Sequence, residues 1–335
     1  MRKGIIEVAS AAGVSIATVS HVINNTRFVS EETKRKVSRA MKELDYRPNS
    51  VARSLRSQKS NTIGLVVPIL PSDTSNFFFM TVAQGIQNTL RKHGYHLLLS
   101  NNTTEEIEDE KEQIRLFNSK LIDGLIIASI AEEVGYLNDI VSSDYPVVFI
   151  DRRPQGYGGD CVVADGYGGA YEAVQTLINK GHREIGLITG GLGITTSNER
   201  FEAYKKALED HDIPFDSSKV MKANSSFDSG YESARDLLSN QKITALFIAN
   251  NVLTMGAMKY IQECRIRVPE ELAVIGFDDY DWTQITTPPL TVIRQPSYEL
   301  GEKAAEIMIE RIMDKNIGKH VEYCLPTSLV MRGSC

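Results

Sequence analysis

The chain has 335 residues, enough for two or three domains, and 42% of them are hydrophobic, which excludes a chain that is disordered throughout. The formal net charge of −6 alone argues against a nucleic-acid partner, but the charge is unevenly distributed. The first 60 residues hold 12 Lys and Arg against 5 Asp and Glu, and the rest hold 25 against 38. A basic head on an acidic body favours a phosphate-binding module joined to another domain; a solvated basic surface is the alternative.

The cysteines and the apolar runs limit the class of protein further. Four cysteines are scattered without a C-x-x-C pair, which indicates neither a disulfide framework nor a zinc site. The N-terminus lacks the apolar core of a signal peptide, and no apolar run is long enough to span a bilayer. We therefore expect a cytoplasmic protein with no membrane partner, no cofactor and no metal.

The first predicted elements are two short helices joined by a tight turn within Ile5–Asn24. Apolar residues recur at helical spacing in both segments. Gly13 suits the positive φ that often follows a helix, and Ser15 can cap the second helix. This pattern is typical of a helix-turn-helix, whose second helix fits the major groove of B-DNA.

A third helix is predicted after Ser30, which is a plausible N-cap, and Tyr46–Asn49 ends it because Pro48 cannot continue a helix. Residues 50–56 have a helix-compatible composition but are too few to form a stable helix alone. The polar residues 57–61 are typical of a linker.

From Thr62 onward, short apolar runs alternate with amphipathic stretches. The strand candidates are Ile63–Val67, Tyr95–Ser100, Gly124–Ala128, Val147–Ile150, Glu184–Thr189, Ala245–Ala249 and Leu272–Gly276. The helix candidates are Phe77–His93, Glu105–Ser119, Glu132–Ser142, Tyr167–Lys180, Asn198–His211, Ser229–Ser239 and Val252–Glu263. This alternation predicts an α/β fold with parallel sheets covered on both faces.

The number of strands, with a polar interruption near Arg152–Asp160, favours two doubly wound sheets rather than one. Leu290–Gln295, the helix Tyr298–Met313 and the strand-like Val321–Val330 would recross between them. A ligand cleft is expected between the two sheets, beyond the carboxyl ends of their strands.

The predicted domain boundaries follow from this reading. They are a helix-turn-helix domain at 1–47, a hinge helix and linker at 48–61, a first lobe at 62–161 with 291–321, and a second lobe at 162–290 with 322–335.

Four motifs resemble the lactose-repressor and galactose-repressor (LacI/GalR) family of bacterial transcription regulators over essentially the whole chain. They are Val8–Asn24, Tyr46–Asn49 with Ala52–Leu55, Lys180–Ile185, and Val274–Asp279 followed by Pro288–Thr291 and Gln295-Pro296. The head is most similar to that of the purine repressor, through Thr18–Asn24 and Thr26–Val29; the ligand domain does not share that closeness. The resemblance implies a two-lobed core like that of periplasmic binding proteins.

The resemblance also implies which residues contact operator DNA. They are Ser15, Ile16, Ala17, Thr18, Ser20, His21, Asn24, Arg27, Asn49, Ala52, Arg53, Leu55 and Arg56. Ile16 and Ala17 would pack on thymine methyl groups, and His21 would donate to a guanine, although a structural role for the histidine is the alternative. The hydroxyls, Asn24 and Arg27 would hold phosphates or merely be solvated.

Leu55 carries the most specific implication of the resemblance. Two copies of the hinge helix would pair in the minor groove, where the leucines open the central base step and bend the duplex. Docking of Leu55 on the protein is the alternative. The resemblance implies a homodimer, because the chain stops near Cys335 without a leucine-zipper tail.

Effector-binding positions are implied by the resemblance and, for Asp151, Arg152 and Asn250, predicted from their place after strands, whose ends face the cleft. They are Asn76, Phe78, Phe79, Asp151, Arg152, Arg200, Asn250, Asp278 and Gln295. Arg can fork onto ligand oxygens and Asp can accept from hydroxyls, although Arg200 and Asp278 could instead form a structural ion pair. The set suits a sugar or similar polyol, and also fits nucleobases and sugar phosphates.

The expected function is thus that of a transcriptional repressor whose binding to an operator is controlled by a small molecule. A sugar-binding receptor of the same two-lobed fold without a DNA role is the alternative. An enzyme is not expected, because the chain lacks G-x-x-x-x-G-K-[ST], H-E-x-x-H and G-x-S-x-G, and Gly190–Gly193 lacks the full dinucleotide pattern.

Overall fold

The computed structural model describes residues 4–24, 27–46, 59–69, 77–102, 106–119, 122–142, 144–153, 155–314 and 318–335. Contacts between Cα atoms divide the chain into two compact units, Met1–Ser60 and Asn61–Cys335. The predicted hinge helix lies outside the described residues.

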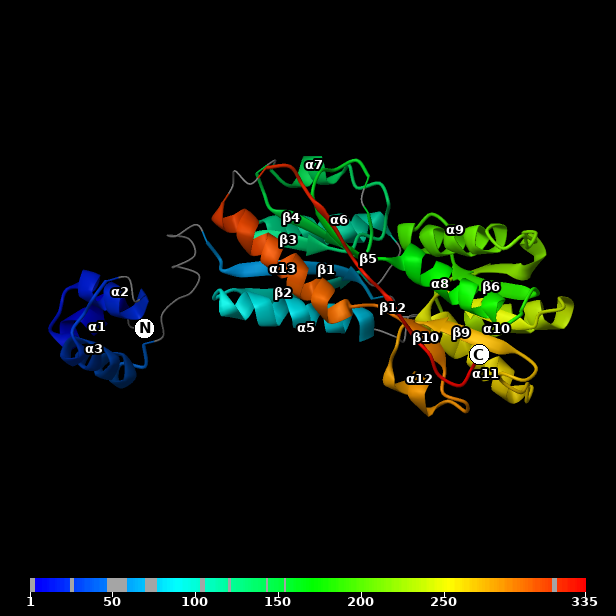
Figure 1. The fold of residues 1–335 in the computed structure, drawn as a ribbon. Helices are drawn as coiled ribbons and strands as arrows, with labels where there is room; N and C mark the ends of the chain where they lie inside the picture. The colour runs from blue at the N-terminus through cyan, green and yellow to red at the C-terminus, as the bar shows by residue number, and fades with distance from the viewer. Residues whose placement is uncertain are drawn as a thin grey trace. The chain divides into compact units, whose positions relative to one another are not determined.

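The first unit consists of three helices, α1 (Ile5–Ala12), α2 (Ile16–Asn24) and α3 (Glu31–Glu43), packed around one small core (Figure 1). Val8, Val19 and Val37 contribute one fully buried side chain from each helix. Because each helix buries only a narrow apolar stripe, the outer faces remain available for polar and basic residues. The predicted three-helix head is therefore confirmed.

Two six-stranded sheets form the second unit. The first contains, in spatial order, β11 (Glu322–Leu325), β5 (Asp160–Ala164), β4 (Val147–Ile150), β3 (Gly124–Ile127), β1 (Thr62–Pro68) and β2 (His96–Asn102). The second contains β12 (Ser328–Val330), β10 (Thr291–Arg294), β9 (Ala273–Phe277), β8 (Ala245–Ile248), β6 (Ile185–Gly190) and β7 (Val220–Ala223). Every pairing is parallel except that of β10 with β12.

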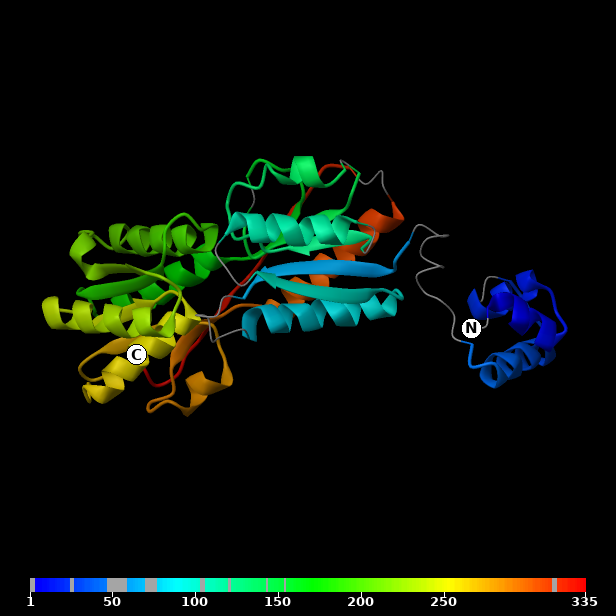
Figure 2. The same cartoon turned by 180° about the vertical axis from the view of Figure 1, so that it is seen from behind.

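Helices cover both faces of each sheet, as the buried apolar strands predict. On the first sheet, α5 (Phe77–Lys92) and α13 (Ser297–Met313) cover one face, and α6 (Ile107–Asn118) and α7 (Leu137–Ile140) the other (Figures 1 and 2). On the second, α8 (Gly166–Asn179) and α9 (Thr195–Glu209) face α10 (Phe227–Asn240) and α11 (Asn251–Glu263) across the sheet. The short α12 (Asp281–Ile285) and a 3-10 turn at Ser217–Lys219 complete the described elements.

Glycine permits a close approach of α5 to α13. A Cβ atom added to Gly85 would lie 2.2 Å from the carbonyl oxygen of Tyr298, and one added to Gly301 would lie 2.1 Å from that of Val82. The two helix backbones therefore touch at these points, which fixes α5, and the residues at its start, against the first sheet.

The strand-like segment Val321–Val330 is two strands in two different sheets. β11 joins the first sheet beside β5, and β12 joins the second beside β10. Pro326 separates them because proline cannot donate a hydrogen bond to a ladder. The chain thus crosses between the lobes after β5, after β10 and between β11 and β12.

This pairing corrects the predicted lobe boundaries. Residues 162–164 complete β5 in the first sheet, although they were assigned to the second lobe. Thr291–Arg294 pairs in the second sheet, and Glu322–Leu325 in the first, each opposite to the predicted lobe. The apolar pattern also missed strands β5 and β7. Of the predicted helix Glu132–Ser142, only Leu137–Ile140 is helical.

No single helix among the described residues is long and apolar enough to cross a bilayer. α1 and the first eight residues of α2 meet the length and composition criteria only as a pair bent by 103°.

Candidate functional site

The turn between α1 and α2 places the predicted DNA-reading residues on the outside of the first unit. Gly13 adopts φ +64°, and the amide of Val14 returns to the carbonyl of Ala9 at 3.0 Å, which ends α1. The Ser15 hydroxyl accepts from the amide of Thr18 at 3.1 Å, as a helix N-cap does. The predicted cap and the positive φ at Gly13 are both confirmed.

The predicted base-contacting positions lie at the start of α2. Ser15, Ile16 and Ala17 are exposed, and Ile16 retains 47% of its accessible surface although it is aliphatic. Thr18, Ser20 and His21 are half-buried, and Arg27 is exposed. Asn24 ends α2. Exposed small and apolar side chains at a helix start offer methyl groups rather than hydrogen bonds to a base edge.

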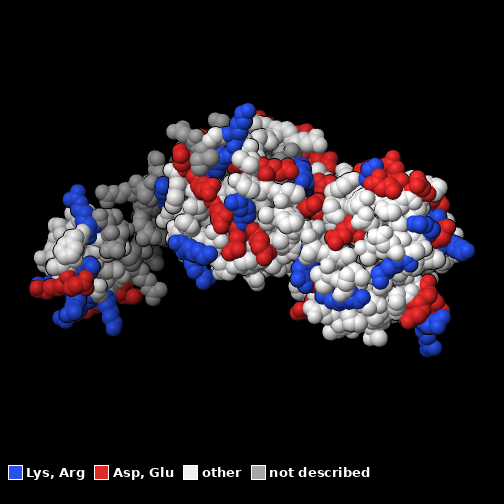
Figure 3. Space-filling model, in the orientation of Figure 1, with Lys and Arg blue, Asp and Glu red and all other residues white. Residues whose placement is uncertain are grey.

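Lys and Arg side chains project from this helical unit beside a group of acidic ones, and side chains of both charges are spread over the second unit (Figure 3). Glu31 and Glu32 at the start of α3 pair with Lys34 and Lys36. The remaining predicted DNA contacts, Asn49, Ala52, Arg53, Leu55 and Arg56, lie outside the described residues, as does the predicted effector contact Asn76.

A cavity of about 470 Å³ lies between the two lobes of the second unit. Eight predicted effector-contacting residues line it: Phe78, Phe79, Asp151, Arg152, Arg200, Asn250, Asp278 and Gln295. Pro68, Ile130, Gly191–Ile194, Thr196, Ser197, Asn224, Ser225, Ala249, Asn251 and Tyr280 complete the lining. The structure therefore brings together, from both sheets, all the predicted cleft residues that it describes.

Arg200 lies at the centre of the charge in this cavity. Its guanidinium donates from Nη1 to the carbonyl of Ala249 at 2.7 Å and lies 3.7 Å from the ring centroid of Phe277. Burial lowers the pKa of Arg200, and the carboxylates of Asp278 and Asp151 oppose that effect. Its Nε has no hydrogen-bond partner among the described residues. A buried arginine with an unused donor suits a ligand oxygen.

Two aspartates with left-handed backbones each follow directly after a strand, one in each lobe. Asp151 follows β4 with φ 66°, and Asp278 follows β9 with φ 71°. Burial raises the pKa of Asp151, although Arg152 and Arg200 oppose it. The carboxylate of Asp278 accepts from Nε2 of Gln295 at 2.7 Å. Strained residues held at a strand end are typical of binding sites.

A buried carboxylate fixes the wall of the cavity beside Arg152. Glu110 is fully buried and accepts hydrogen bonds from the Ser129 hydroxyl at 2.7 Å, the amide of Ile130 at 2.9 Å and the Tyr136 hydroxyl. The carbonyl of Ser129 in turn accepts from Nη1 of Arg152 at 2.5 Å. Because a buried charge must be satisfied by donors, this network orients the loop that carries Ile130.

Polar contacts from the start of α9 join the two lobes beside the cavity. Arg153, which follows β4, pairs with Glu199 on α9 and with Glu322 on β11. The amide of Arg153 also donates to Thr195 Oγ1 at 3.3 Å, and Nδ2 of Asn198 to Glu132 at 3.2 Å. The helical turn that presents Arg200 is thus held against the other lobe.

Two asparagines at the cavity are held in place by hydrogen bonds: Asn250 caps helix α11, and Asn251 is bonded to the indole of Trp282. The Asn250 side chain accepts from the amide of Leu253 at 3.1 Å. Trp282 packs on the core of the second sheet and donates from Nε1 to Asn251 at 3.1 Å. Trp282 is therefore a packing residue that also holds the side chain of a cavity residue.

Several cavity residues were missed by sequence reasoning, notably Ile130, Thr196, Asn251 and Tyr280. Ile130 and Tyr280 lie in the loops that leave the carboxyl ends of β3 and β9, so the rule that ligands bind beyond strand ends was the signal that could have found them. Thr196 belongs to the first turn of α9, whose start was predicted three residues too late.

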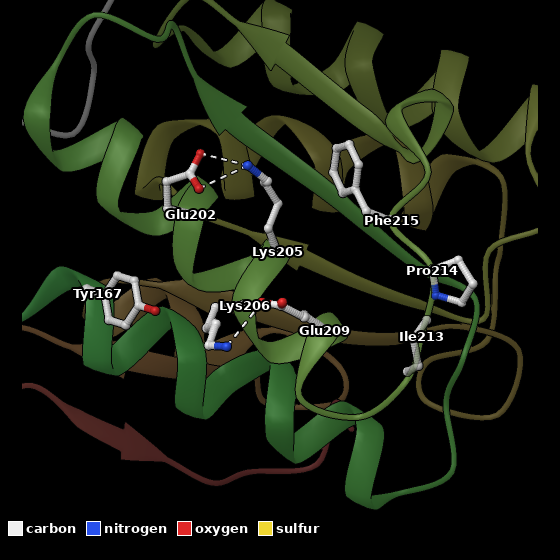
Figure 4. Close-up of a pocket in the computed structure, with 8 residues that line it drawn as sticks. All are labelled: Tyr167, Glu202, Lys205, Lys206, Glu209, Ile213, Pro214 and Phe215. Carbon is white, nitrogen blue, oxygen red and sulfur yellow. Dashed lines mark hydrogen bonds and ion pairs between the residues drawn. The ribbon is translucent and has the colours of Figure 1, made fainter.

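A second hollow of about 570 Å³ lies on the outer surface of α8 and α9 (Figure 4). Tyr167, Glu202, Lys205, Lys206, Glu209, Ile213, Pro214 and Phe215 line it. Lys205 pairs with Glu202 at 3.0 Å and Lys206 with Glu209 at 3.1 Å. Because these charges already neutralise one another, this hollow is a weaker candidate than the cleft between the lobes. The described residues contain no group of three His, Cys, Asp or Glu that could hold a metal ion.

A helix-turn-helix unit joined to a two-lobed α/β unit with a charged interlobe cleft defines a class of protein, the transcription regulators that couple a DNA-reading head to a ligand-binding core. Comparisons with known proteins agree with this class. Residues 4–49 match the family model of bacterial regulatory proteins, lacI family, and residues 174–335 match a periplasmic binding protein-like domain.

Relatives match over both units. The chain is 36% identical over 318 residues to the HTH-type transcriptional repressor PurR of Vibrio atlanticus, which covers 94% of this chain and 93% of the relative. It is similar to the solved Lac repressor dimer bound to operator and the anti-inducer ONPF, with a TM-score of 0.88 and 26% identity over 100% and 99% of the two chains. The CelR–cellobiose complex is similar with a TM-score of 0.74 and 28% identity over 100% of both chains.

The chain belongs to the LacI family and is a DNA-binding transcriptional repressor, not an enzyme. The likeness to PurR is not confined to the head, because the match extends over 94% of this chain.

Proposed function

We propose that the chain represses transcription as a homodimer on a pseudo-palindromic operator, and that a sugar or sugar derivative bound between the lobes controls this binding. The protein acts where the DNA lies, in the cytoplasm. The observation that carries the effector proposal is that the buried Arg200 and Asp278 and the half-buried Asp151 line one cavity. Carboxylates and a guanidinium that line the same cavity can supply both the acceptors and the donors that the hydroxyl groups of a polyol require.

The aromatic wall supports the same class of ligand. Phe78 and Phe79 line the cavity from the first lobe, and a ring face packs well on the C–H face of a pyranose. Relatives point the same way: a similar structure contains cellobiose, and that of a LacI-family regulator from Enterococcus faecium contains ribose. The proposed effector contacts are Asn76, Phe78, Phe79, Asp151, Arg152, Arg200, Asn250, Asp278 and Gln295.

The dimer is supported by the edge of the first sheet. β2 is an edge strand, and its Leu98 and Leu99 are each 38% exposed. Adjacent exposed leucines on an edge strand are typical of a surface covered by another chain. In a dimer, two heads would each read one half of a pseudo-palindrome.

DNA contacts are proposed for the start of α2, with Ser15, Ile16, Ala17, Thr18, Ser20, His21, Asn24 and Arg27. Asn49, Ala52, Arg53, Leu55 and Arg56 are proposed from the resemblance alone. Selection of binding sites from random DNA should enrich a pseudo-palindrome. Enrichment of a single half-site without its inverted repeat would contradict the pseudo-palindrome and the dimer.

A thermal-shift screen of the full chain against sugars, sugar phosphates and purines tests the effector. A ligand stabilises the folded state by RT ln(1 + [L]/Kd), about 2.7 kcal/mol at a hundredfold excess over Kd. Arg200→Met should abolish the shift, whereas Lys205→Met, one turn further along α9 and outside the cavity, should keep it. A shift by purines alone would contradict the sugar proposal.

A further inference from the structure

One aromatic contact joins the two lobes. The ring centroids of Phe77 and Tyr280 are 5.2 Å apart, and the ring planes are inclined by 40°. Phe77 is the first residue of α5, which packs on the first sheet, and Tyr280 follows β9 of the second sheet. The two rings therefore come from opposite lobes, and any movement that separates the lobes here must part them.

The ring pair lies at the rim of the cleft. Tyr280 lines the cavity, whereas Phe77 retains 54% of its accessible surface. The pair thus extends from the cavity wall to solvent. Phe78 and Phe79, the next two residues of α5, line the cavity on the inner side, so the start of α5 contributes both a wall and a rim.

The ring contact is chemically unlike the other contacts between the lobes. Those near α9 are ionic or polar, and the Arg153–Glu199 pair keeps 32% and 25% of its side-chain surface exposed. Partly exposed ion pairs contribute little net stability, because water and salt screen them. Parting the two rings, by contrast, would expose apolar surface to water, a cost that salt does not screen.

We propose that Phe77 and Tyr280 form an aromatic gate at the rim of the cleft, which holds the lobes closed in the absence of an effector. This proposal depends on the proposed function in one respect, namely that the effector binds in the cleft. If the effector binds the closed form, its apparent Kd equals the intrinsic Kd divided by the closed fraction. The gate therefore sets the effector concentration at which the repressor responds.

Distance measurements across the rim of the full chain, without any effector, test the gate. Spin labels are placed at Met80→Cys on α5 and Gln284→Cys on α12, two exposed positions. The background carries Cys264→Ser, Cys324→Ser and Cys335→Ser. The buried Cys161 is kept, because burial raises its pKa to about 12 and leaves it a thiol. Labelled chains are diluted into unlabelled chains, so that only distances within one chain are measured.

Phe77→Ala and Tyr280→Ala should each increase the ratio of long to short distances by roughly threefold to tenfold, the equivalent of one lost aromatic pair. Tyr280→Phe keeps the ring and should leave the distribution unchanged. Phe215→Ala is the matched control, because Phe215 packs edge-on against Phe201 within one lobe at 6.0 Å. Since Phe77 is largely exposed, its alanine variant should fold even if Tyr280→Ala does not.

An unchanged distribution in Phe77→Ala, or an equal shift in Phe215→Ala, would overturn the gate. The assay contains no effector, so a shift in the gate variants would stand even if the sugar screen found no ligand. Conversely, a sugar hit with unchanged distances would support the proposed function and refute the gate.

Discussion

The helix-turn-helix head and the interlobe cleft place their functional residues in opposite environments. In the head, Ser15, Ile16 and Ala17 are exposed on a helix whose packing depends on other residues, such as Val19. In the cleft, Arg200 and Asp278 are themselves buried. Substitutions at these positions of the head can therefore change DNA recognition without changing the stability of the fold. Substitutions of the charged cleft residues affect both ligand binding and stability.

The largest expected effect follows from Asp279, the neighbour of the cleft residue Asp278. Its side chain is 3% exposed and accepts hydrogen bonds from Arg294, Arg332 and Thr283. Asp279→Asn should lower the free energy of unfolding by about 3 kcal/mol at pH 7, because it leaves the largely buried Arg332 without its counter-ion. Urea unfolding measures this, and the exposed Asp281→Asn is the control.

The pH dependence of that variant has a definite sign. Burial alone would raise the pKa of Asp279, but the hydrogen bonds from Arg294 and Arg332 outweigh it and hold the pKa below its usual range. The stability contributed by the carboxylate is therefore present above the unfolded pKa of about 3.9 and lost as the pH falls through the folded value. The gap between wild type and Asp279→Asn should narrow in acid; a gap independent of pH would assign the loss to packing.

A smaller effect, confined to recognition, is expected for His21 in the head. His21→Ala should weaken operator binding by about 1–3 kcal/mol if the imidazole reads a base. The free energy of unfolding should change by less than about 0.5 kcal/mol. Fluorescence anisotropy with the selected operator measures the affinity, and His93→Ala in the other unit is the control. A variant that loses stability but not affinity would show that His21 is structural.

The smallest effect is expected at Asp151, with a gain in stability. Burial raises the pKa of Asp151 in the folded state above its value in the unfolded chain. The protonated side chain therefore contributes stability that is fully present below the unfolded pKa and is lost as the pH rises through the folded pKa. Asp151→Asn should raise the free energy of unfolding by about 1 kcal/mol at pH 7, while weakening effector binding. Asn also tolerates the left-handed backbone at this position.

Unfolding at pH 7 and pH 3.5 tests that prediction, with the exposed Asp139→Asn as control. The gain should vanish at the lower pH. A loss of stability at pH 7 would mean that Arg152 and Arg200 fully compensate the cost of burying the carboxylate.

Much of this architecture could be predicted from sequence, because periodicity reports local structure directly. The strands of the second unit that are long apolar runs, such as β6 and β8, were predicted to within a residue or two. The strand β5 was missed because Asp160 and two preceding glycines concealed a short apolar run. Which sheet a strand joins depends on contacts with residues far away in the sequence. The composition of β10 and β11 therefore could not show that each joins the sheet of the other lobe from the one predicted.

The same limit applies to the site. The strand-end rule identified Asp151 and Asp278, and the resemblance identified Arg200, all of which line one cavity. The strand-end rule could have placed Tyr280 at the cavity, but not its contact with Phe77, which belongs to the other lobe. Glu110 could not be identified either, because its sequence context on α6 is that of an ordinary solvated acid and only the structure shows that it is buried.

The hydrogen bond from Trp282 to Asn251 has a practical consequence. Trp282 is the single tryptophan of the chain, and its partner Asn251 lines the cleft. Indole emission shifts with local polarity and hydrogen bonding, so a molecule that engages Asn251 alters the environment of the one strong fluorophore. The intrinsic fluorescence of Trp282 can thus report ligand binding in the cleft of the unlabelled protein.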